Sequence, residues 1–312
     1  MKRKIKIGTR GSQLALWQAN HIKSILEEKY PDYSFELVKI KTQGDKILDV
    51  ALSKVGGKGL FVKELEDALL DGKVDFAVHS MKDVPVILPD GLHLTAITKR
   101  EDPRDCFISK NYNNLSDLPK GAKVGTSSLR RQCQILNLRS DLKVEVLRGN
   151  VETRIRKMTE GIFDAVILAY AGVKRLNLIE YVKDVISEDF SLPAIGQGAL
   201  GIECRVNDDE VNNLLSILND EDSSVCVRAE RAFLRVLEGG CQVPIGAYGK
   251  IIDNKLVLKG LVGTLDGKTI IKETVSGEKT DAEALGEALA ETILNRGGRK
   301  ILEDVYGREI GS

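Results

Sequence analysis

Apolar and polar positions alternate with two different periods through the first two hundred residues. Short apolar or strictly alternating runs predict strands, and apolar residues repeating every three or four positions predict amphipathic helices. The predicted strands are 5–8, 34–41, 74–79, 123–125, 143–147 and 163–168, and the predicted helices are 12–28, 61–70, 128–138 and 151–160. Strands that alternate with helices in this way predict βαβ units and largely parallel sheets.

Two stretches of this pattern repeat each other in the same order. Lys6-Ile7-Gly8-Thr9 leads to Ser12, much as Lys123-Val124-Gly125-Thr126 leads to Ser127 and Ser128. Further along, Gly72-Lys73-Val74-Asp75-Phe76-Ala77-Val78 is echoed by Gly161-Ile162-Phe163-Asp164-Ala165-Val166-Ile167. The repetition predicts two similar α/β lobes with a cleft between them.

The pattern changes after residue 221. A helix over 223–237 precedes three strands, and two further helices end the chain, so we expect a small α+β third domain. These strands are 243–250, 255–263 and 269–275, and the helices are 282–294 and 299–303. A charged stretch at 99–103 and a turn-rich one at 191–198 indicate two crossings between the lobes. The predicted domains are therefore 1–98 with 199–217, 104–192, and 221–312.

Composition is typical of a globular protein with a substantial core. The chain is 42% hydrophobic and 29% charged with a formal net charge of zero, which does not favour a nucleic-acid or membrane-surface protein. No apolar run approaches the roughly 20 residues that span a bilayer, and the N-terminus lacks the apolar run of a secretion signal. Five scattered cysteines and three scattered histidines lack metal-ligand spacing. We therefore expect a cytoplasmic protein without a metal.

Both Gly-Thr turns join a predicted strand to a predicted helix. Backbone N–H groups and the helix dipole favour an anion at such a position. Arg10 and Ser12 belong to the first turn, and the second adds Thr126, Ser127, Ser128, Arg130 and Arg131. Each turn alone is better explained as a Ser/Thr helix cap, but two turns at one cleft favour anion binding. Neither matches the glycine-lysine pattern of a nucleotide-binding loop.

Arginines gather in the predicted second lobe. Because arginine binds carboxylates with two parallel hydrogen bonds, the set predicts a ligand with many carboxylates. Arg148 and Arg175 follow predicted strands, where ligands of α/β folds bind. Arg139 and Arg156 are expected on solvated helix surface. The full set is Arg130, Arg131, Arg139, Arg148, Arg154, Arg156 and Arg175.

Three further segments could carry chemistry. Asp83, beside Lys82 at a predicted strand end, should stay ionised and could stabilise a cation or move a proton, although an Asx turn before Pro85 explains it equally well. The glycine-rich loop from Lys54 to Lys58 is either a lid or a linker. Cys241 follows two glycines in a turn that would expose its thiol to reaction or modification, although most loop cysteines are inert.

Together these motifs resemble the hydroxymethylbilane synthase (porphobilinogen deaminase) family. The segment Glu230-Arg231-Ala232-Phe233-Leu234, followed by Leu237-Glu238-Gly239-Gly240-Cys241-Gln242-Val243-Pro244, resembles its cofactor-attachment signature. Other family-like stretches follow the same order, at 8–12, 42–45, 79–83, 125–131 and 196–200. The resemblance covers essentially the whole chain.

The resemblance implies a two-lobed fold like that of periplasmic binding proteins, with a cysteine-bearing third domain. It implies a dipyrromethane cofactor joined to Cys241 by a thioether. Porphobilinogen loses ammonia to give an azafulvene-like electrophile, which the terminal cofactor ring attacks. After four additions, hydrolysis releases the linear tetrapyrrole hydroxymethylbilane, a step of porphyrin biosynthesis.

The resemblance also implies roles for individual residues. Asp83 assists deamination and stabilises positive charge on pyrrole nitrogens, and Lys82 and Ser80 contact the cofactor, with Gln197 near the hinge. The Lys54 to Lys58 loop closes over the cleft. The carboxylate arms are bound by Arg10, Ser12, Thr126, Ser127, Ser128, Arg130, Arg131, Arg148, Arg154 and Arg175.

Two other classes of protein remain open from the residues themselves. A two-lobed fold also serves ligand-binding modules of receptors and sensors. A thiol hydrolase could use Cys241 with a spatially close His79. Covalent pyrrole on Cys241 distinguishes the synthase from both. We expect a monomer, because no symmetric apolar patch is indicated.

Overall fold

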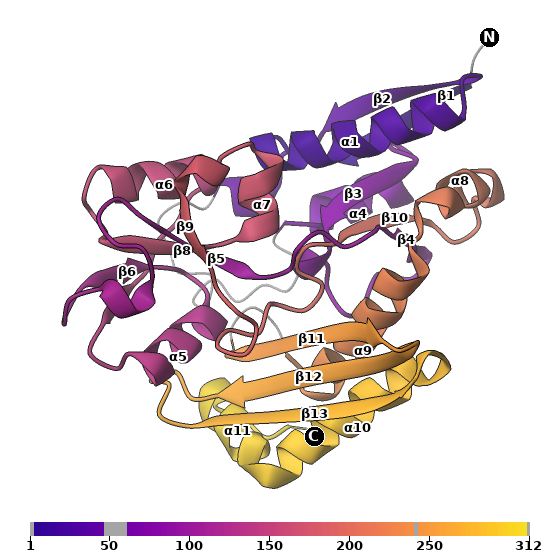
Figure 1. Ribbon diagram of the computed structural model, residues 1–312. Helices are drawn as coiled ribbons and strands as arrows, with labels where there is room; N and C mark the ends of the chain where they lie inside the picture. The colour runs from indigo at the N-terminus through magenta and orange to yellow at the C-terminus, as the bar shows by residue number, and fades with distance from the viewer. Residues whose placement is uncertain (1–2, 47–60, 240–242, 311–312) are drawn as a thin grey trace. The chain divides into compact units, whose positions relative to one another are not determined.

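The computed structural model describes residues 3–46, 61–239 and 243–310 (Figure 1). The chain divides into two compact units. Of the described residues, the first contains 3–46, 61–101 and 198–224, and the second contains 102–197, 225–239 and 243–310. The chain thus leaves the first unit and returns to it after residue 197.

The first unit is one α/β lobe around a five-stranded sheet, which we call the first lobe. Its strand order is β2-β1-β3-β10-β4, and only β10 runs against the other four. Helix α1 covers one face and α4 lies against the other. The elements are β1 (Arg3–Thr9), α1 (Gln13–Lys29), β2 (Tyr33–Lys39), α2 (Gln43–Lys46), α4 (Lys63–Leu70), β3 (Phe76–Ser80), β4 (Leu92–Ile97), β10 (Leu200–Arg205) and α8 (Asp209–Leu215).

The second unit contains a lobe of the same topology, which we call the second lobe. Its strand order is β7-β6-β8-β5-β9, and here only β5 runs against the others. The elements are β5 (Asp105–Ser109), β6 (Lys123–Gly125), α5 (Leu129–Leu138), β7 (Lys143–Glu145), α6 (Val151–Thr159), β8 (Ala165–Ala169), α7 (Tyr170–Arg175) and β9 (Val182–Val185).

The repeated sequence motif has the same structural role in each lobe. Asp75 precedes β3, and its carboxylate accepts a hydrogen bond from the Lys6 backbone N–H at 2.7 Å. Asp164 precedes β8 and accepts one from the Lys123 N–H at the same distance. In both cases the aspartate N–H bonds back to the carbonyl of that lysine. The predicted internal repeat is therefore confirmed by matching strands and matching bonds.

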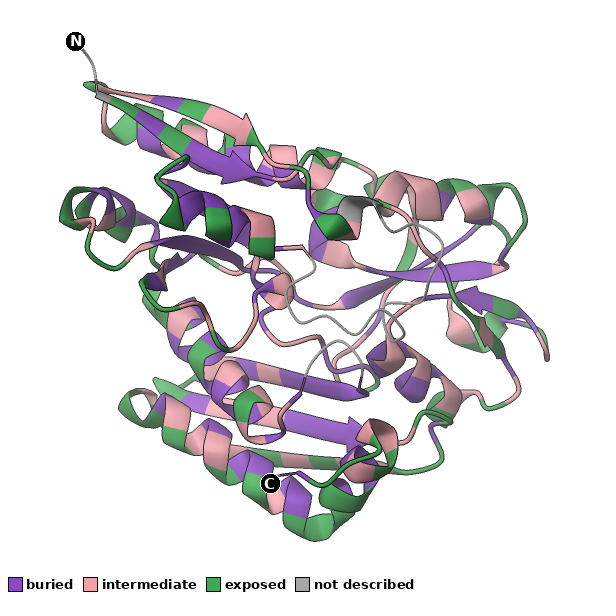
Figure 2. Cartoon of the chain, turned by 180° about the vertical axis from the view of Figure 1, so that it is seen from behind, coloured by how far each residue is buried: buried purple, intermediate pink, exposed green. Residues whose placement is uncertain are grey.

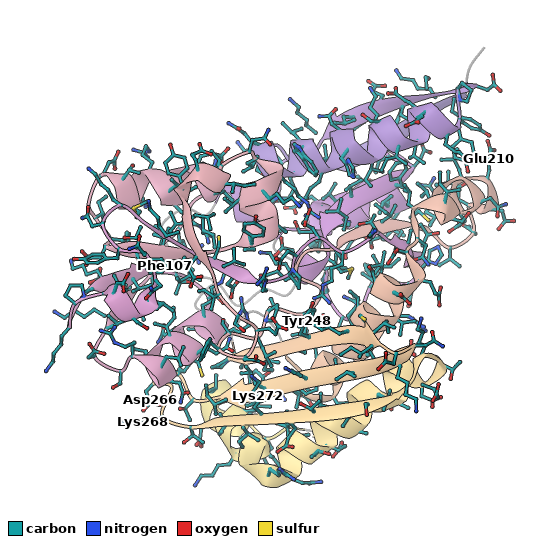
Figure 3. All side chains as sticks on the ribbon, in the orientation of Figure 1. Phe107, Glu210, Tyr248, Asp266, Lys268 and Lys272 are labelled. Carbon is teal, nitrogen blue, oxygen red and sulfur yellow. The ribbon has the colours of Figure 1, made fainter. Side chains whose placement is uncertain are left out.

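The second unit also holds a small antiparallel sheet, β11-β12-β13, whose core is shared with helices α9, α10 and α11. The hairpin that joins β12 to β13 meets α5 of the second lobe, where Gln132 and Asn137 donate to the carbonyls of Leu265 and Gly267. Asp266 and Lys268 lie at the tip of this hairpin (Figure 3). The elements are α9 (Glu221–Val236), β11 (Ile245–Ile252), β12 (Lys255–Gly263), β13 (Ile270–Glu278), α10 (Ala282–Ile293), a π-helical turn (Leu294–Gly298) and α11 (Arg299–Tyr306).

Every predicted strand and helix is present, with boundaries that differ by a few residues. The strands β4, β5, β9 and β10 and helices α2, α7 and α8 were not predicted. β5 and β10 are buried and run antiparallel to their neighbours. Because a βαβ unit joins parallel strands, the repeated pattern does not predict these two strands. Burial follows the expected pattern, with strands largely enclosed and the outer helix faces exposed (Figure 2).

We propose that the second unit consists of two domains, 104–192 and 221–312, beside a first lobe made of 1–98 and 199–217. Two observations support this division. The second unit holds two separate sheets, and the apolar cluster of the small sheet shares no residue with the two clusters of the second lobe.

Candidate active site

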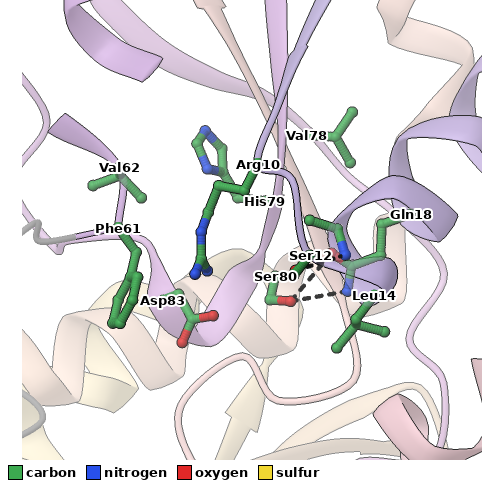
Figure 4. Close-up of a pocket in the computed structure, with 11 residues that line it drawn as sticks. Arg10, Ser12, Leu14, Gln18, Phe61, Val62, Val78, His79, Ser80 and Asp83 are labelled. Carbon is green, nitrogen blue, oxygen red and sulfur yellow. Dashed lines mark hydrogen bonds between the residues drawn. The ribbon is translucent and has the colours of Figure 1, made fainter. Parts of the chain in front are cut away.

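A pocket opens in the first lobe at the carboxyl ends of β1 and β3 (Figure 4). Arg10 directly follows β1, Ser80 ends β3, and Asp83 ends the 3₁₀ turn Met81–Asp83. Carboxyl ends of neighbouring parallel strands meet at one edge of a sheet, so the topology gathers these three side chains. The lining residues are Arg10, Ser12, Leu14, Ala15, Gln18, Phe61, Val62, Val78, His79, Ser80 and Asp83.

The pocket places a cation and a carboxylate together. The guanidinium of Arg10 and the carboxylate of Asp83 point into the same space (Figure 4). The Cζ of Arg10 lies 4.3 Å from the centre of the Phe61 ring, so an aromatic face helps to hold the guanidinium. The predicted residues Arg10, Ser12, Ser80 and Asp83 thus line one pocket, whereas Phe61 was not predicted.

Hydrogen bonds organise the serines of this pocket. Ser12 caps α1, and its Oγ accepts from the Ala15 N–H at 3.3 Å. Gln18 donates from Nε2 to the Ser80 Oγ at 2.9 Å, a contact that the sequence did not indicate. The helix-cap explanation of the first Gly-Thr turn is therefore confirmed for Ser12. Because a hydroxyl that accepts one bond can still donate its own proton, the cap does not conflict with anion binding.

The second Gly-Thr turn uses its hydroxyls in a similar way. Ser128 caps α5 by accepting from the Arg131 N–H at 3.4 Å, and Thr126 Oγ1 accepts from the Ser128 N–H at 3.2 Å. Ser127 donates its hydroxyl to the carbonyl of Leu147. These three side chains shape the turn, and anion binding by them stays a prediction.

Arg130 and Arg131 are buried around Asp105, which sequence reasoning missed. Arg130 contacts both Asp105 oxygens, at 2.8 and 3.2 Å, and Arg131 donates to Asp105 Oδ1 from Nε at 3.0 Å and Nη2 at 2.8 Å. Burial of Asp105 raises the pKa of its carboxyl, but the two guanidinium charges outweigh burial and hold that pKa well below its usual value. Arg130 and Arg131 were expected to bind the carboxylate arms of a ligand, but both already pair with the carboxylate of Asp105. The sequence signal for this cluster is Asp105 itself, an acidic residue directly before the apolar residues 106–108.

Gln197 belongs to the same buried cluster. Its Nε2 donates to the Pro103 carbonyl at 2.6 Å and to Asp105 Oδ1 at 2.9 Å. Residue 197 is the last of its segment in the second unit. The side chain of Gln197 therefore connects the end of this stretch of chain to its start at residues 103 and 105, near the predicted crossing.

The remaining arginines of the second lobe differ in their surroundings. Arg148 has its Nε and Nη2 buried without a hydrogen-bond partner among the described residues. Arg154 donates from Nε to the Gly149 carbonyl at 2.8 Å, and Arg175 is the last residue of α7. Buried guanidinium nitrogens without partners are rare in folded proteins, so Arg148 is the arginine best prepared to receive an anionic ligand.

Three predicted site residues lie outside the described part of the chain. They are Lys54 and Lys58 of the glycine-rich loop and Cys241 of the attachment signature. Lys82 is described and lies in the 3₁₀ turn beside Asp83. Among the described residues, no group of histidine, cysteine and carboxylate side chains could hold a metal ion. In the same part of the chain, no helix is both long and apolar enough to cross a membrane.

Comparison with known proteins accounts for nearly the whole chain. Residues 5–213 match the family model "Porphobilinogen deaminase, dipyromethane cofactor binding domain", and residues 224–295 match "Porphobilinogen deaminase, C-terminal domain". The chain belongs to the porphobilinogen deaminase family. A porphobilinogen deaminase of Geobacter sulfurreducens is 58% identical over 98% of this chain and 96% of its own length. That of Pelobacter propionicus is 57% identical over 99% of both chains.

Solved structures with similar folds are more distant. The methionine-binding protein MetQ aligns over 69% of this chain and 89% of its own, with 15% identity and a TM-score of 0.43. The periplasmic aliphatic sulphonate binding protein SsuA of Escherichia coli aligns over 75% and 70%, with 15% identity and a TM-score of 0.40. The family resemblance predicted from the motifs is confirmed by the sequence matches.

Proposed function

We propose that this chain is a hydroxymethylbilane synthase, which condenses four porphobilinogen molecules with loss of ammonia and releases the linear tetrapyrrole by hydrolysis. The observation that carries the proposal is the presence of the Asp83 carboxylate and the Arg10 guanidinium in one pocket at the strand ends. Porphobilinogen carries both a leaving amino group and carboxylate arms, so it needs an anion and a cation side by side. Family membership supplies the reaction.

The residues present fit a dipyrromethane. That group carries several carboxylate arms, and Arg148 has buried guanidinium nitrogens without a partner among the described residues. Arg10 and the Ser12 hydroxyl add a cation and a donor in the first lobe. When bound, the dipyrromethane supplies the pyrrole carbon to which substrate units are added. We propose Cys241, outside the described residues, as its attachment point.

Asp83 is the proposed catalytic residue. Its carboxylate is partly exposed at the pocket, next to Lys82 in the same turn. A carboxylate there accepts hydrogen bonds from pyrrole N–H groups and stabilises the positive charge that develops as the amino group leaves. Ser80, held by Gln18, and Lys82 are proposed to position the rings beside it.

The arginines are proposed to divide into two groups. Arg10, Arg148, Arg154 and Arg175, with Ser12, Thr126, Ser127 and Ser128, bind carboxylate arms. Arg130 and Arg131 hold the start of α5 through Asp105 and Gln197, and we propose that they also contribute positive charge to the binding of the arms. Lys54 and Lys58, outside the described residues, are proposed to close over the bound chain.

We further propose that the enzyme works as a monomer in the cytoplasm, with porphobilinogen as its small-molecule substrate and no nucleic-acid partner. The balanced charge of the chain supports the last point, because nucleic-acid-binding surfaces are typically rich in basic residues.

Intact mass tests the proposal. The purified wild type should exceed its calculated mass by two linked pyrrole units, and Cys241→Ser should carry no excess. Peptide mapping provides the control, since Cys106, Cys133, Cys204 and Cys226 are buried and should stay unmodified. Incubation with porphobilinogen should then add further pyrrole units to the wild type alone. An unmodified wild type that also fails to consume porphobilinogen would favour a ligand-binding module instead.

A further inference from the structure

A cluster of buried ionisable side chains lies behind the pocket and is not used in the function proposed above. Glu66 comes from α4, His79 from β3 and Glu203 from β10. His79 Nε2 is 2.8 Å from Glu203 Oε2, and the two side chains are only 3% and 0% exposed. Glu66 is 7% exposed as a residue. Ionisable groups are rarely buried this completely unless they have a partner or a role.

The two carboxyl groups of this cluster are not fully paired. Glu66 Oε1 and Glu203 Oε1 are both buried without a hydrogen-bond partner among the described residues. Burial, and then the nearby charge of Glu203, raise the pKa of Glu66 to about 7, against a smaller opposing effect from His79. Glu66 therefore carries a proton below neutral pH and loses it as the pH rises above neutral.

The second lobe shows that the fold does not require polar groups at these positions. Asp75 and Asp164 provide the common reference point. Glu66 lies nine residues before Asp75, and Ile155 lies nine residues before Asp164. In the same way, His79 and Leu168 each lie four residues after the aspartate of their lobe. Glu203 lies opposite Ala77 in the first sheet, and Ile108 lies opposite Val166 in the second. Because Ala77 and Val166 match, Glu203 corresponds to Ile108.

Ile108, Ile155 and Leu168 all belong to one buried apolar cluster. The same backbone thus packs hydrocarbon in the second lobe and ionisable groups in the first. A buried polar cluster adds little to stability compared with apolar packing, so we look for its role in the pocket.

His79 links the cluster to the pocket. It lines the pocket together with Arg10 and Asp83, while its Nε2 contacts Glu203 behind it. Helix α4, which carries Glu66, follows Phe61 and Val62, and both of these also line the pocket. Among the described residues, His79 therefore lies between Glu66 and the pocket, so a change of charge at Glu66 acts on the pocket across His79.

Among the described residues, few other charges face Glu66. Helix α4 packs against β1, β3, β4 and β10. His79 and Glu203 are the groups of those strands that act on the pKa of Glu66, and exposed Asp67 acts from its own helix. Arg205 of β10 binds the Leu69 carbonyl at the end of α4, and His93 of β4 binds Asn212. The proton on Glu66 is thus set locally.

We propose that Glu66 is a positioning residue that sets the charge behind the pocket: protonated, it is neutral, and ionised, it adds a negative charge that opposes binding of carboxylate-bearing substrate. The proposal rests on the proposed function. It assigns to Glu66 an effect on KM that appears as the pH rises above neutral, and leaves the chemistry to Asp83.

The test compares holoenzymes of the wild type, Glu66→Gln and Asp67→Asn. Steady-state KM and kcat for porphobilinogen are measured between about pH 6 and about pH 8.5, on either side of neutral. Wild-type KM should rise roughly three- to tenfold over this range, as one added charge near the pocket predicts. Glu66→Gln should keep the low KM throughout, with kcat unchanged. Asp67→Asn removes an exposed charge from the same helix, and it should follow the wild type closely because Asp67 has the smallest effect on the pKa of Glu66.

Two results would overturn the inference. One is a Glu66→Gln variant whose KM rises with pH as the wild type does. The other is a uniform loss of kcat in that variant at every pH, which indicates only a structural role. If the wild type makes no tetrapyrrole at all, the proposed function fails instead, so the two failures are distinguishable.

A second variant covers the case in which Glu66→Gln does not fold. The triple substitution Glu66→Ile, His79→Leu and Glu203→Ile places the residues of the second lobe in the first. Because those residues already pack in the same topology, the variant should fold with a melting temperature at least equal to that of the wild type. Its KM should lose the dependence on pH. A triple variant that folds and keeps that dependence contradicts the proposal.

Discussion

The two α/β lobes share their strand order and the aspartate that bridges β1 to β3 and β6 to β8, but they bury different side chains. The first lobe holds Glu66, His79 and Glu203 between its sheet and α4. The second lobe fills the corresponding positions with isoleucine and leucine, and instead buries charge at the start of α5, where Arg130 and Arg131 surround Asp105. The comparison teaches that the repeated backbone determines where strands end, while each lobe sets its own electrostatics there.

This difference also separates two kinds of arginine. Arg10 of the first lobe points into a pocket with Asp83, next to an aromatic ring. Arg130 and Arg131 of the second lobe each have a protein carboxylate within 3 Å. We therefore expect substitutions in the first lobe to act on turnover, and substitutions around Asp105 to act on stability. The following predictions test this contrast, from the largest expected effect to the smallest.

Replacing Asp83 by asparagine should lower kcat by roughly 100-fold or more, because the side chain keeps its shape but loses the charge that stabilises the developing cation. The melting temperature should change little, since Asp83 is partly exposed at the pocket. Single-turnover and steady-state rates with porphobilinogen provide the measurement. Near-normal kcat in this variant would exclude Asp83 from the reaction.

Replacing Asp105 by asparagine should reduce the free energy of unfolding by about 3–5 kcal/mol, because two buried guanidinium groups lose their shared counter-charge. Urea titration measures the effect. Asp141→Asn is a matched control, since Asp141 pairs with Arg139 near the surface and should change stability by less than about 1 kcal/mol. Equal effects of the two substitutions would show that burial does not govern the Asp105 cluster.

The pKa of Asp105 is lowered, so the stability from its ion pairs is present above the unfolded value of about 4 and declines only as pH falls below it. The Asp105→Asn effect should therefore be constant across neutral pH. A loss of the difference between variant and wild type near neutral pH would contradict this assignment.

The pKa of Glu66 is raised from 4.5 to about 7, so folding retains a proton that the unfolded chain releases within this range. Between these values the free energy of unfolding of the wild type should fall as pH rises, by about 1–3 kcal/mol after allowance for solvent screening. Glu66→Gln should flatten this slope, and Asp67→Asn should not. Urea titrations at several pH values measure it, and identical slopes in wild type and Glu66→Gln would show that Glu66 titrates normally.

Much of the fold followed from periodicity. The βαβ repeats of both lobes and the strands of the small sheet were predicted from the sequence. The helix-cap alternative for the two Gly-Thr turns is confirmed at Ser12 and Ser128, whose side chains act on the next turn of the same chain. The antiparallel strands β5 and β10 were missed, because their partners β8 and β3 are far away in sequence.

The candidate site divides in the same way. Arg10, Ser12, Ser80 and Asp83 were predicted, since each follows or ends a recognisable strand or turn. Gln18 and Phe61 were missed, because a buried helix glutamine and a lone aromatic residue give no local sign of what they contact. Which arms of a bound ligand each arginine holds stays a prediction.

By itself, the sequence determined the alternation of strands and helices, the internal repeat, the family and the residue types available at each strand end. These properties depend on neighbouring residues or on motifs read in order. Only the tertiary structure decided that Asp105 would hold Arg130 and Arg131, and that Glu66, His79 and Glu203 would meet behind the pocket. Charges and buried polar groups interact across space, so their partners, and the pKa values that follow, depend on which strands the fold places side by side.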